Sequence, residues 1–284
     1  MTAQWRTRNP FIAALLSLLV PGLGQIYNGK GALGLVFLLI SIALPFLWGV
    51  SGWPRHFTGL VAFALAAIVF RLFIVVHAFI QARRIRETEL KTYQTTGAYA
   101  FFIIISLSLT IFVPARIWMS SLGVSPYKIS TASMMPTLQK DDLLMADPKA
   151  YNAQAPKRGD LVVFEYPKDP TKQFLMRVIV IEGEMVEIKN KRLFIDGEPL
   201  PESYKVHIDS HVNTKNDSCG YEDVIRDNYG PVSVTPGHCF VMGDNRDNSL
   251  DSRFWGFLPL ANAKGQALYI YWAKDNKRIG LTLK

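Results

Sequence analysis

The chain has 284 residues, of which 49% are hydrophobic, and its formal net charge at neutral pH is +8. A basic balance can indicate nucleic-acid binding, but part of this positive charge lies beside long apolar runs, as it does in the cytoplasmic loops of membrane proteins. We therefore expect contact with membrane lipid and no nucleic-acid partner. Residues 1–120 hold nearly all the long apolar runs, whereas residues 121–284 alternate apolar and polar positions and carry most of the charge. This contrast predicts two domains.

The first apolar segment, residues 11–27, follows Arg6 and Arg8 in the manner of a signal peptide. No small-residue cleavage site is obvious after it and further apolar segments follow, which favours an uncleaved anchor. Residues 21–25 read Pro-Gly-Leu-Gly-Gln, and their glycines permit close helix packing. The segment is therefore expected to kink, to span thinly or to re-enter, and we assign it no catalytic role.

Three further apolar segments, at 32–50, 58–80 and 98–119, are long enough to cross about 30 Å of hydrocarbon at about 20 residues each. The sequence thus predicts three or four transmembrane segments. The densest positive cluster between them, residues 83–91, is expected in the cytoplasm, so the chain after about Ser120 lies on the outer side. Four full spans would also place Arg6 and Arg8 outside, which the same rule disfavours. A re-entrant first segment would remove this conflict.

Short apolar or alternating runs follow Lys128, and Gly, Pro, Asn and Asp separate them. Such runs predict strands of an all-β domain that is large enough to bury its own core. Residues 189–192 and 196–199 have the composition of hairpin turns. The predicted fold is α + β in separate parts, with N-terminal transmembrane helices followed by an all-β extracytoplasmic domain. The expected strands are 143–146, 161–166, 174–181, 185–188, 193–195, 239–242 and 267–272.

Residues 202–236 are polar and are expected to be an insertion between the β segments. His207 and His211 have a spacing that could bind a metal on a helix, but no Glu follows the first His and strand breakers surround both. We expect solvated loop histidines and no metal or other cofactor. The two cysteines, Cys219 and Cys239, could form one disulfide in an oxidising compartment or be small reduced core residues. The sequence leaves these two alternatives open.

The stretch from Ser130 to Leu138 contains Pro136, which has no N–H donor and fixes φ, so the backbone bends and presents Ser133. A single turn serine usually caps its own backbone, but three further segments accompany this one. Residues 158–164 read Arg-Gly-Asp-Leu-Val-Val-Phe, residues 174–184 begin Phe-Leu-Met-Arg, and residues 243–253 read Gly-Asp-Asn-Arg-Asp-Asn-Ser-Leu-Asp-Ser-Arg. In this order, from about residue 129 onward, the segments resemble the sequence boxes of bacterial signal peptidase I, serine peptidase family S26.

The resemblance implies a multi-pass protein of the bacterial inner membrane that removes signal peptides from exported preproteins, with its catalytic domain on the outer side. Ser133 would be the nucleophile, and its own N–H and the Thr131 hydroxyl would form the oxyanion hole. Ser249 would orient the general base, and Asp251 would pair with Arg253 as structural support. The substrate would dock as an added strand. Met134 and Met135 would then lie near the substrate, although core packing is an equal alternative.

One position departs from the family pattern. The third box of the family reads Tyr-Ile-Lys-Arg, in which the lysine is the general base, and Met176 stands at the lysine position. Met has a similar length but no basic group, so the chain as written is expected to be inactive or strongly impaired. Lys128, Lys172 and Arg177 are not convincing substitutes. Arg177 in particular is excluded because an arginine is always charged. An introduced change and a naturally silent homologue both remain open.

Two other functions are compatible with parts of the sequence. A non-catalytic homologue could bind signal peptides or membrane partners without cutting them. A membrane transporter with an external β domain is a weaker hypothesis, because the apolar spans lack an acidic or basic pair apart from Arg71 and His77.

Overall fold

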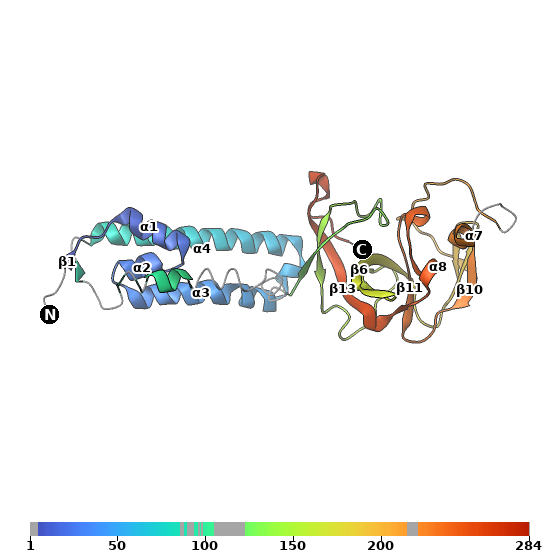
Figure 1. The fold of residues 1–284 in the computed structure, drawn as a ribbon, viewed down its shortest axis with the longest axis horizontal. Coiled ribbons are helices and arrows are strands. Elements are labelled where there is room, and N and C mark those ends of the chain that lie inside the picture. The colour runs from blue at the N-terminus through green and yellow to red at the C-terminus, as the bar shows by residue number, and fades with distance from the viewer. Residues whose placement is uncertain are drawn as a thin grey trace. The chain divides into compact units, whose positions relative to one another are not determined.

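A computed structural model describes residues 5–85, 88, 89, 94, 95, 97, 99–104, 123–214 and 221–283. The chain divides into two compact units, Met1–Gly123 and Val124–Lys284. The division lies close to the boundary after residue 120 that composition predicts. Figure 1 shows the ribbon of both units.

The first unit is helical. Two of its helices, α3 and α4, are long and apolar enough to cross a membrane, by length and composition. They coincide with the apolar segments predicted at 32–50 and 58–80, whereas most of the third, 98–119, lies outside the described residues. The elements of this unit are β1 (Trp5–Arg6), α1 (Pro10–Leu19), α2 (Leu23–Tyr27), α3 (Gly31–Val50), the 3₁₀ turn η1 (Trp53–Arg55), α4 (Phe57–Arg84) and β2 (Thr88–Glu89).

The first apolar segment forms a helical hairpin. Helix α1 has ten residues and is therefore about 15 Å long, roughly half of what a span requires. Gly22 then adopts a φ of 88°, which reverses the chain into α2. A Cβ atom on Gly22 would lie 1.9 Å from the Gly34 carbonyl oxygen, and one on Gly24 would lie 2.1 Å from that of Ala13. The glycines are thus required by direct backbone contacts.

Buried polar side chains attach this hairpin to α4. The Gln25 Nε2 donates to the Ile74 carbonyl at 2.9 Å, and the Asn28 Nδ2 donates to the Ala78 carbonyl at 2.9 Å. The Ser17 hydroxyl donates to the Gln25 Oε1 at 3.1 Å. All three polar side chains are almost completely buried. Internal hydrogen bonds of this kind are what a polar group needs where no water can reach it.

Helices α1 and α4 run antiparallel along each other (Figure 1). The Phe11 ring packs on Phe79 with centroids 5.4 Å apart, while the Arg71 Nη2 donates to the Leu19 carbonyl at 3.4 Å. The start of α1 therefore lies at the end of the unit where α4 terminates. The positive charges that precede α1 and those that close α4 share that end. This is the arrangement that the re-entrant alternative requires.

The second unit contains two antiparallel sheets (Figure 1). The larger has seven strands in the order β12-β11-β6-β5-β13-β4-β3, and the smaller has four in the order β10-β7-β8-β9. The strands are β3 (Ser125–Lys128), β4 (Leu143–Asp147), β5 (Leu161–Tyr166), β6 (Asp169–Val180), β7 (Met185–Lys189), β8 (Arg192–Ile195), β9 (Glu198–Pro199), β10 (Tyr229–Ser233), β11 (His238–Met242), β12 (Leu258–Pro259) and β13 (Ala263–Trp272). Helices α7 (Tyr221–Asp227) and α8 (Ser252–Trp255) and 3₁₀ turns η2 (Arg246–Asn248), η3 (Leu260–Asn262) and η4 (Asn276–Arg278) complete the unit.

All seven predicted strands are present, so the expected order of transmembrane-type helices followed by a β domain is confirmed. Strand β6 begins five residues before its predicted start at 174 because it extends along β5 as a hairpin. The predictions missed β3, β10 and α7. Strand β10 contains Pro231 and lies at the edge of the smaller sheet, where a proline is tolerated but obscures the strand pattern.

Strands β6 and β11 separate two hydrophobic cores. Along β6, Met176 and Val178 belong to one core and Ile179 to the other. Along β11, Val241 belongs to the first core and Phe240 to the second. This alternation, which ends at Val180 in the second core, is the period-two pattern of a strand that is buried on both faces. It places Met176 in the core that also receives the Ser133 loop through Met134 and Leu138.

Candidate active site

The Ser133 loop follows β3 and is a tight turn. The Met135 N–H donates to the Ala132 carbonyl at 3.2 Å, and the Leu138 N–H donates to the Met134 carbonyl at 2.8 Å. Met134 and Leu138 are buried in the first core, and they anchor the loop from below. Ser133 itself remains half-buried.

A hydroxyl pair marks this loop. The Thr131 Oγ1 lies 3.0 Å from the Ser133 Oγ, within hydrogen-bond distance. Within the described part of the chain, the Ser133 N–H donates to no acceptor. The loop therefore presents two hydroxyls and a backbone donor close together.

The loop that follows β11 holds the Ser133 loop. The Asn245 N–H donates to the Ser133 carbonyl at 2.9 Å, and the Asn245 Nδ2 donates to the Ala132 carbonyl at 3.1 Å. A Cβ atom on Gly243 would lie 2.5 Å from the Ser133 carbonyl oxygen and 2.3 Å from the Ser249 Oγ. Only glycine fits here, because any side chain would force the two loops apart.

A buried ion pair ties β6 to both loops. The Arg177 Nε and Nη2 donate to the two carboxylate oxygens of Asp244 at 2.9 and 2.8 Å, and both side chains are at most 2% exposed. The Thr137 hydroxyl donates to the same carboxylate at 2.5 Å. The guanidinium also lies 4.1 Å from the centre of the Tyr204 ring. Such a bidentate pair fixes geometry strongly, so β6 is held relative to the Ser133 loop.

Met176 points away from this ion pair, into the first core. It is opposite Val162 on β5 and is 3% exposed. Together with Ser133 it lines a cavity of about 520 Å³. The cavity lining also includes Thr131, Met134 and Ser249, so five of the predicted site residues meet there. The other lining residues are Tyr127, Lys128, Ile129, Ser130, Ala132, Val163, Gln173, Phe174, Leu175, Arg226, Asp247, Asn248, Leu250 and Phe254.

Asp251 and Arg253 do not line the cavity but support it. The Arg253 Nε and Nη2 each donate to one Asp251 oxygen at 2.8 Å, and both side chains are buried. The Gly243 N–H donates to the Asp251 Oδ2 and to the Ser249 Oγ, both at 3.2 Å. Ser249 thus joins the support to the cavity.

Met134 and Met135 have different environments. Met134 is 1% exposed and forms a wall of the cavity as part of the core. Met135 is 39% exposed and is not among the lining residues. The core-packing alternative therefore describes Met134, and its place on the cavity wall is compatible with the predicted position near the substrate.

The three basic residues considered as substitutes for the missing base are all in ion pairs. Lys128 lines the cavity, but its side chain is 63% exposed and its Nζ lies 3.0 Å from Asp141. Lys172 pairs with Asp169 at 2.9 Å and is not a lining residue. Arg177 is committed to Asp244. A basic side chain that a carboxylate already holds is a poor proton acceptor.

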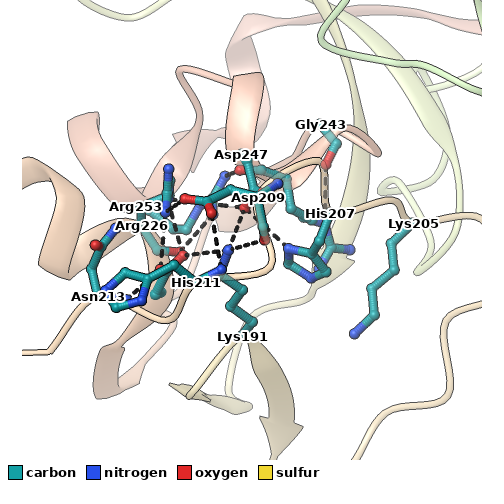
Figure 2. A network of polar contacts seen from close by, with 12 residues as sticks. Lys191, Lys205, His207, Asp209, His211, Asn213, Arg226, Gly243, Asp247 and Arg253 are labelled. Atoms are coloured by element: carbon teal, nitrogen blue, oxygen red, sulfur yellow. Dashed lines mark hydrogen bonds and ion pairs between the residues drawn. The ribbon is translucent and has the colours of Figure 1, made fainter.

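The prediction of solvated loop histidines is wrong for His207. Its Nδ1 lies 3.1 Å from the Asp247 Oδ1, and its side chain is 24% exposed (Figure 2). Burial lowers its pKa, although the hydrogen bond with Asp247 acts in the opposite direction. Val206 forms a parallel bridge with Asn245, which brings the segment against the loop that holds Ser133. His211 is exposed, as predicted, and the described residues contain no cluster of three potential metal ligands.

Asp247 is the centre of this contact, and no sequence pattern pointed to it beyond its place between Arg246 and Ser249. Burial acts to raise its pKa, but hydrogen bonds from the Asp209 N–H, His207 and Lys191 together lower it to about 2. Asp247 is therefore ionised at neutral pH. It also lines the cavity of Ser133.

Cys239 is a free thiol that is buried in the first core. Burial raises its pKa to about 12, so it is protonated at neutral pH. The reduced alternative therefore describes Cys239, while Cys219 lies outside the described residues.

The regions that match known proteins include most of the second unit and the end of the first. A family model described as "Signal peptidase, peptidase S26" matches residues 98–272. The probable signal peptidase I-1 of Synechocystis sp. is 36% identical over 154 residues, which are 52% of this chain and 70% of that protein. The signal peptidase I of Aquifex aeolicus is 30% identical over 212 residues, with 59% of this chain and 83% of that protein covered. A signal peptidase I structure from Enterococcus faecalis has a TM-score of 0.30 at 28% identity, and the match covers 40% of this chain and 97% of that one.

Proposed function

Because the chain belongs to the signal peptidase family, peptidase S26, we propose that it binds the signal peptides of exported preproteins at the Ser133 cavity. We further propose that Met176 leaves this serine-protease site without its general base. The observation that carries the proposal is the placement of Ser133 and Met176 on one cavity, in which Met176 is 3% exposed.

Peptide hydrolysis by a serine needs a base that removes the hydroxyl proton. In the family this base is a lysine, which desolvation keeps neutral by lowering its pKa. The apolar wall around position 176 fits such a lysine. Methionine fills the same space, but its thioether is only a weak acceptor and cannot take a proton from serine at neutral pH.

The remaining catalytic parts are assigned on the same basis. Ser133 is the nucleophile, and its unengaged N–H and the Thr131 hydroxyl are the oxyanion donors. Ser249 orients the base where a base is present, and Asp251 and Arg253 hold the loop that carries it. In this assignment the site is complete apart from one amino group.

The substrate is an extended peptide segment that docks beside Ser133 as an added strand. The family is membrane-associated, and α3 and α4 are suited to a bilayer. We place the chain in a bacterial inner membrane in contact with lipid, with the second unit on the outer side. The positive-inside rule applied to residues 83–91 supports this orientation.

A non-catalytic binding or regulatory role is the second candidate function. Met176 favours it directly, because a site that binds without cutting needs no base. In both cases the chain as written should retain the peptide intact. The two candidates differ in whether the site regains activity when a lysine is supplied at position 176.

Binding without turnover can be measured on the full chain in detergent micelles with a fluorescent synthetic signal peptide. We expect saturable binding and, by mass spectrometry, an intact peptide after prolonged incubation. Rapid cleavage that Ser133→Ala abolishes would contradict the proposal, since another residue would then be the base. Absence of binding would contradict both candidates.

A further inference from the structure

A cation from the polar segment 202–236 lines the same cavity as Ser133. Arg226 lies in the last turn of α7, and it is a lining residue together with Ser133, Met176 and Ser249. The family boxes quoted above do not include it. Its carbonyl accepts a hydrogen bond from the Arg253 Nη1 at 2.7 Å, which connects α7 to the supported loop of the site.

Two carboxylates hold the Arg226 side chain on one side. Its Nε donates to the Asp227 Oδ1 at 3.0 Å, and its Nη2 donates to the Asp209 Oδ2 at 2.9 Å and to the Asp227 Oδ2 at 3.1 Å (Figure 2). The side chain is 15% exposed. Its third nitrogen, Nη1, has no hydrogen-bond partner in the described part of the chain. Arg226 thus has one donor nitrogen left over while the rest of its guanidinium is fixed.

The neighbouring carboxylate of Asp247 does not compete for this donor. Its oxygens accept from the Asp209 N–H at 2.8 Å and from Lys191 at 3.2 Å, besides the contact with His207. Asp247 comes no closer to Arg226 than 3.9 Å, at the Nε. Figure 2 shows Lys191, His207, Arg226 and Asp247 close together. The charge of Arg226 is thus compensated by Asp209 and Asp227, and its Nη1 remains a fixed hydrogen-bond donor on a residue that lines the cavity.

We propose that Arg226 is a peptide-binding residue, whose Nη1 donates a hydrogen bond to an oxygen of the peptide bound beside Ser133. This inference rests on the proposed function. The acceptor is a main-chain carbonyl or a carboxylate of the peptide, and the compensated charge favours the carbonyl. A guanidinium that is already fixed loses little conformational freedom when it binds, so the contact contributes to affinity at a low entropic cost.

The test compares affinities of the full chain and its variants in detergent for two fluorescent peptides. One is a signal peptide without acidic residues near the cut site, and the other carries one Glu there. Arg226→Gln removes the charge and shortens the side chain so that no guanidinium Nη1 remains, and Arg226→Lys keeps a charge for Asp209 and Asp227 but lacks the planar guanidinium. Arg192→Gln, at an exposed position of β8 outside the cavity, is the charge-matched control.

We expect both Arg226 variants to bind the neutral peptide about tenfold more weakly, as the loss of one hydrogen bond to a charged donor implies. The control should bind like the parent chain. An equal loss for both peptides identifies a main-chain carbonyl, and a larger loss for the Glu peptide identifies a carboxylate. Thermal melting monitors folding, and Arg226→Lys decides the question if Arg226→Gln unfolds.

Full affinity of a folded Arg226 variant for both peptides would overturn the inference while leaving the proposed function intact. A parent chain that binds neither peptide would instead contradict the proposed function, and the inference with it.

Discussion

Ser133 and Met176 are held in place by residues behind them. Asn245 binds the carbonyl of Ser133, and the Arg177–Asp244 pair fixes the strand that carries Met176. None of these contacts involves the Met176 side chain. A substitution at position 176 therefore changes the chemistry of the cavity, while the contacts that hold the Ser133 loop and β6 remain.

The position of β6 relative to the Ser133 loop depends on Asp244. Asp244→Asn removes the charge that compensates the buried guanidinium of Arg177, and loss of one partner of a buried ion pair typically costs about 3–5 kcal/mol. We expect the free energy of unfolding of the second unit to fall by this amount. Denaturant unfolding of the full chain in detergent, followed by tryptophan fluorescence, measures it.

Asp169→Asn is the matched control, because the Asp169–Lys172 pair lies on the surface. It should leave the unfolding curve unchanged, since exposed pairs contribute little. Equal changes in the free energy of unfolding for the two substitutions would show that the buried pair does not stabilise the second unit.

Single residues also show where sequence reasoning stops. Five residues of the cavity could be predicted because they lie in short boxes with a recognisable order, as Ser133 and Ser249 do. His207 could not, because its partner Asp247 is 40 positions away. No local pattern distinguishes a histidine that faces such a partner from one that faces water. Arg226 lies in a segment without apolar periodicity and gave no signal.

Among the elements, the α1–α2 hairpin depends most on its exact sequence. Gly22 and Gly24 allow backbone contacts, and Gln25 satisfies groups on α4. The sequence predicted an interruption at residues 21–25 and left a kinked span and a re-entrant segment open. Hydrogen bonds from this hairpin to α4 decide between the kinked span and the re-entrant segment. Composition does not contain that information.

The hairpin predicts that residues before α1 lie on the same side of the membrane as the end of α4. Single cysteines can replace the exposed residues Thr7, Ser51 and Arg84 in a chain whose native cysteines are changed to alanine. With a membrane-impermeant thiol reagent on intact cells, Thr7→Cys and Arg84→Cys should behave alike and Ser51→Cys should behave oppositely. Labelling of Thr7→Cys together with Ser51→Cys would instead show that the first segment spans.

The hairpin turns of the β domain, in contrast, could be predicted from local sequence. Turns at 189–192 and 196–199 were predicted from composition, and the structure pairs Lys189 with Arg192 and Ile195 with Glu198 across them. Asn190, Lys191, Asp196 and Gly197 have positive φ, as tight hairpin turns require. Local turn chemistry sufficed here. Strand β3 was missed because Pro126 and neighbouring polar residues hide an edge strand.

At the scale of the whole molecule, the two units place their polar side chains in different surroundings. In the first unit, polar side chains such as Gln25 and Asn28 are paired inside a helical assembly with an apolar exterior. In the second, two sheets enclose apolar cores and leave polar residues at the cavity. Composition predicted this division because the two surroundings select different residues.

The central claim is that the second unit is a signal-peptidase site that lacks only its base. Met176→Lys supplies an amino group in a space of similar length, so little repacking is needed. Loss of a base from such a site typically costs on the order of 10⁴–10⁶-fold in rate. The decisive measurement is the rate at which the purified Met176→Lys chain cleaves a preprotein, compared with the chain as written and with Met176→Lys combined with Ser133→Ala. We expect a large gain that the Ser133 substitution abolishes; a Met176→Lys chain that binds the preprotein yet gains no cleavage would contradict the claim.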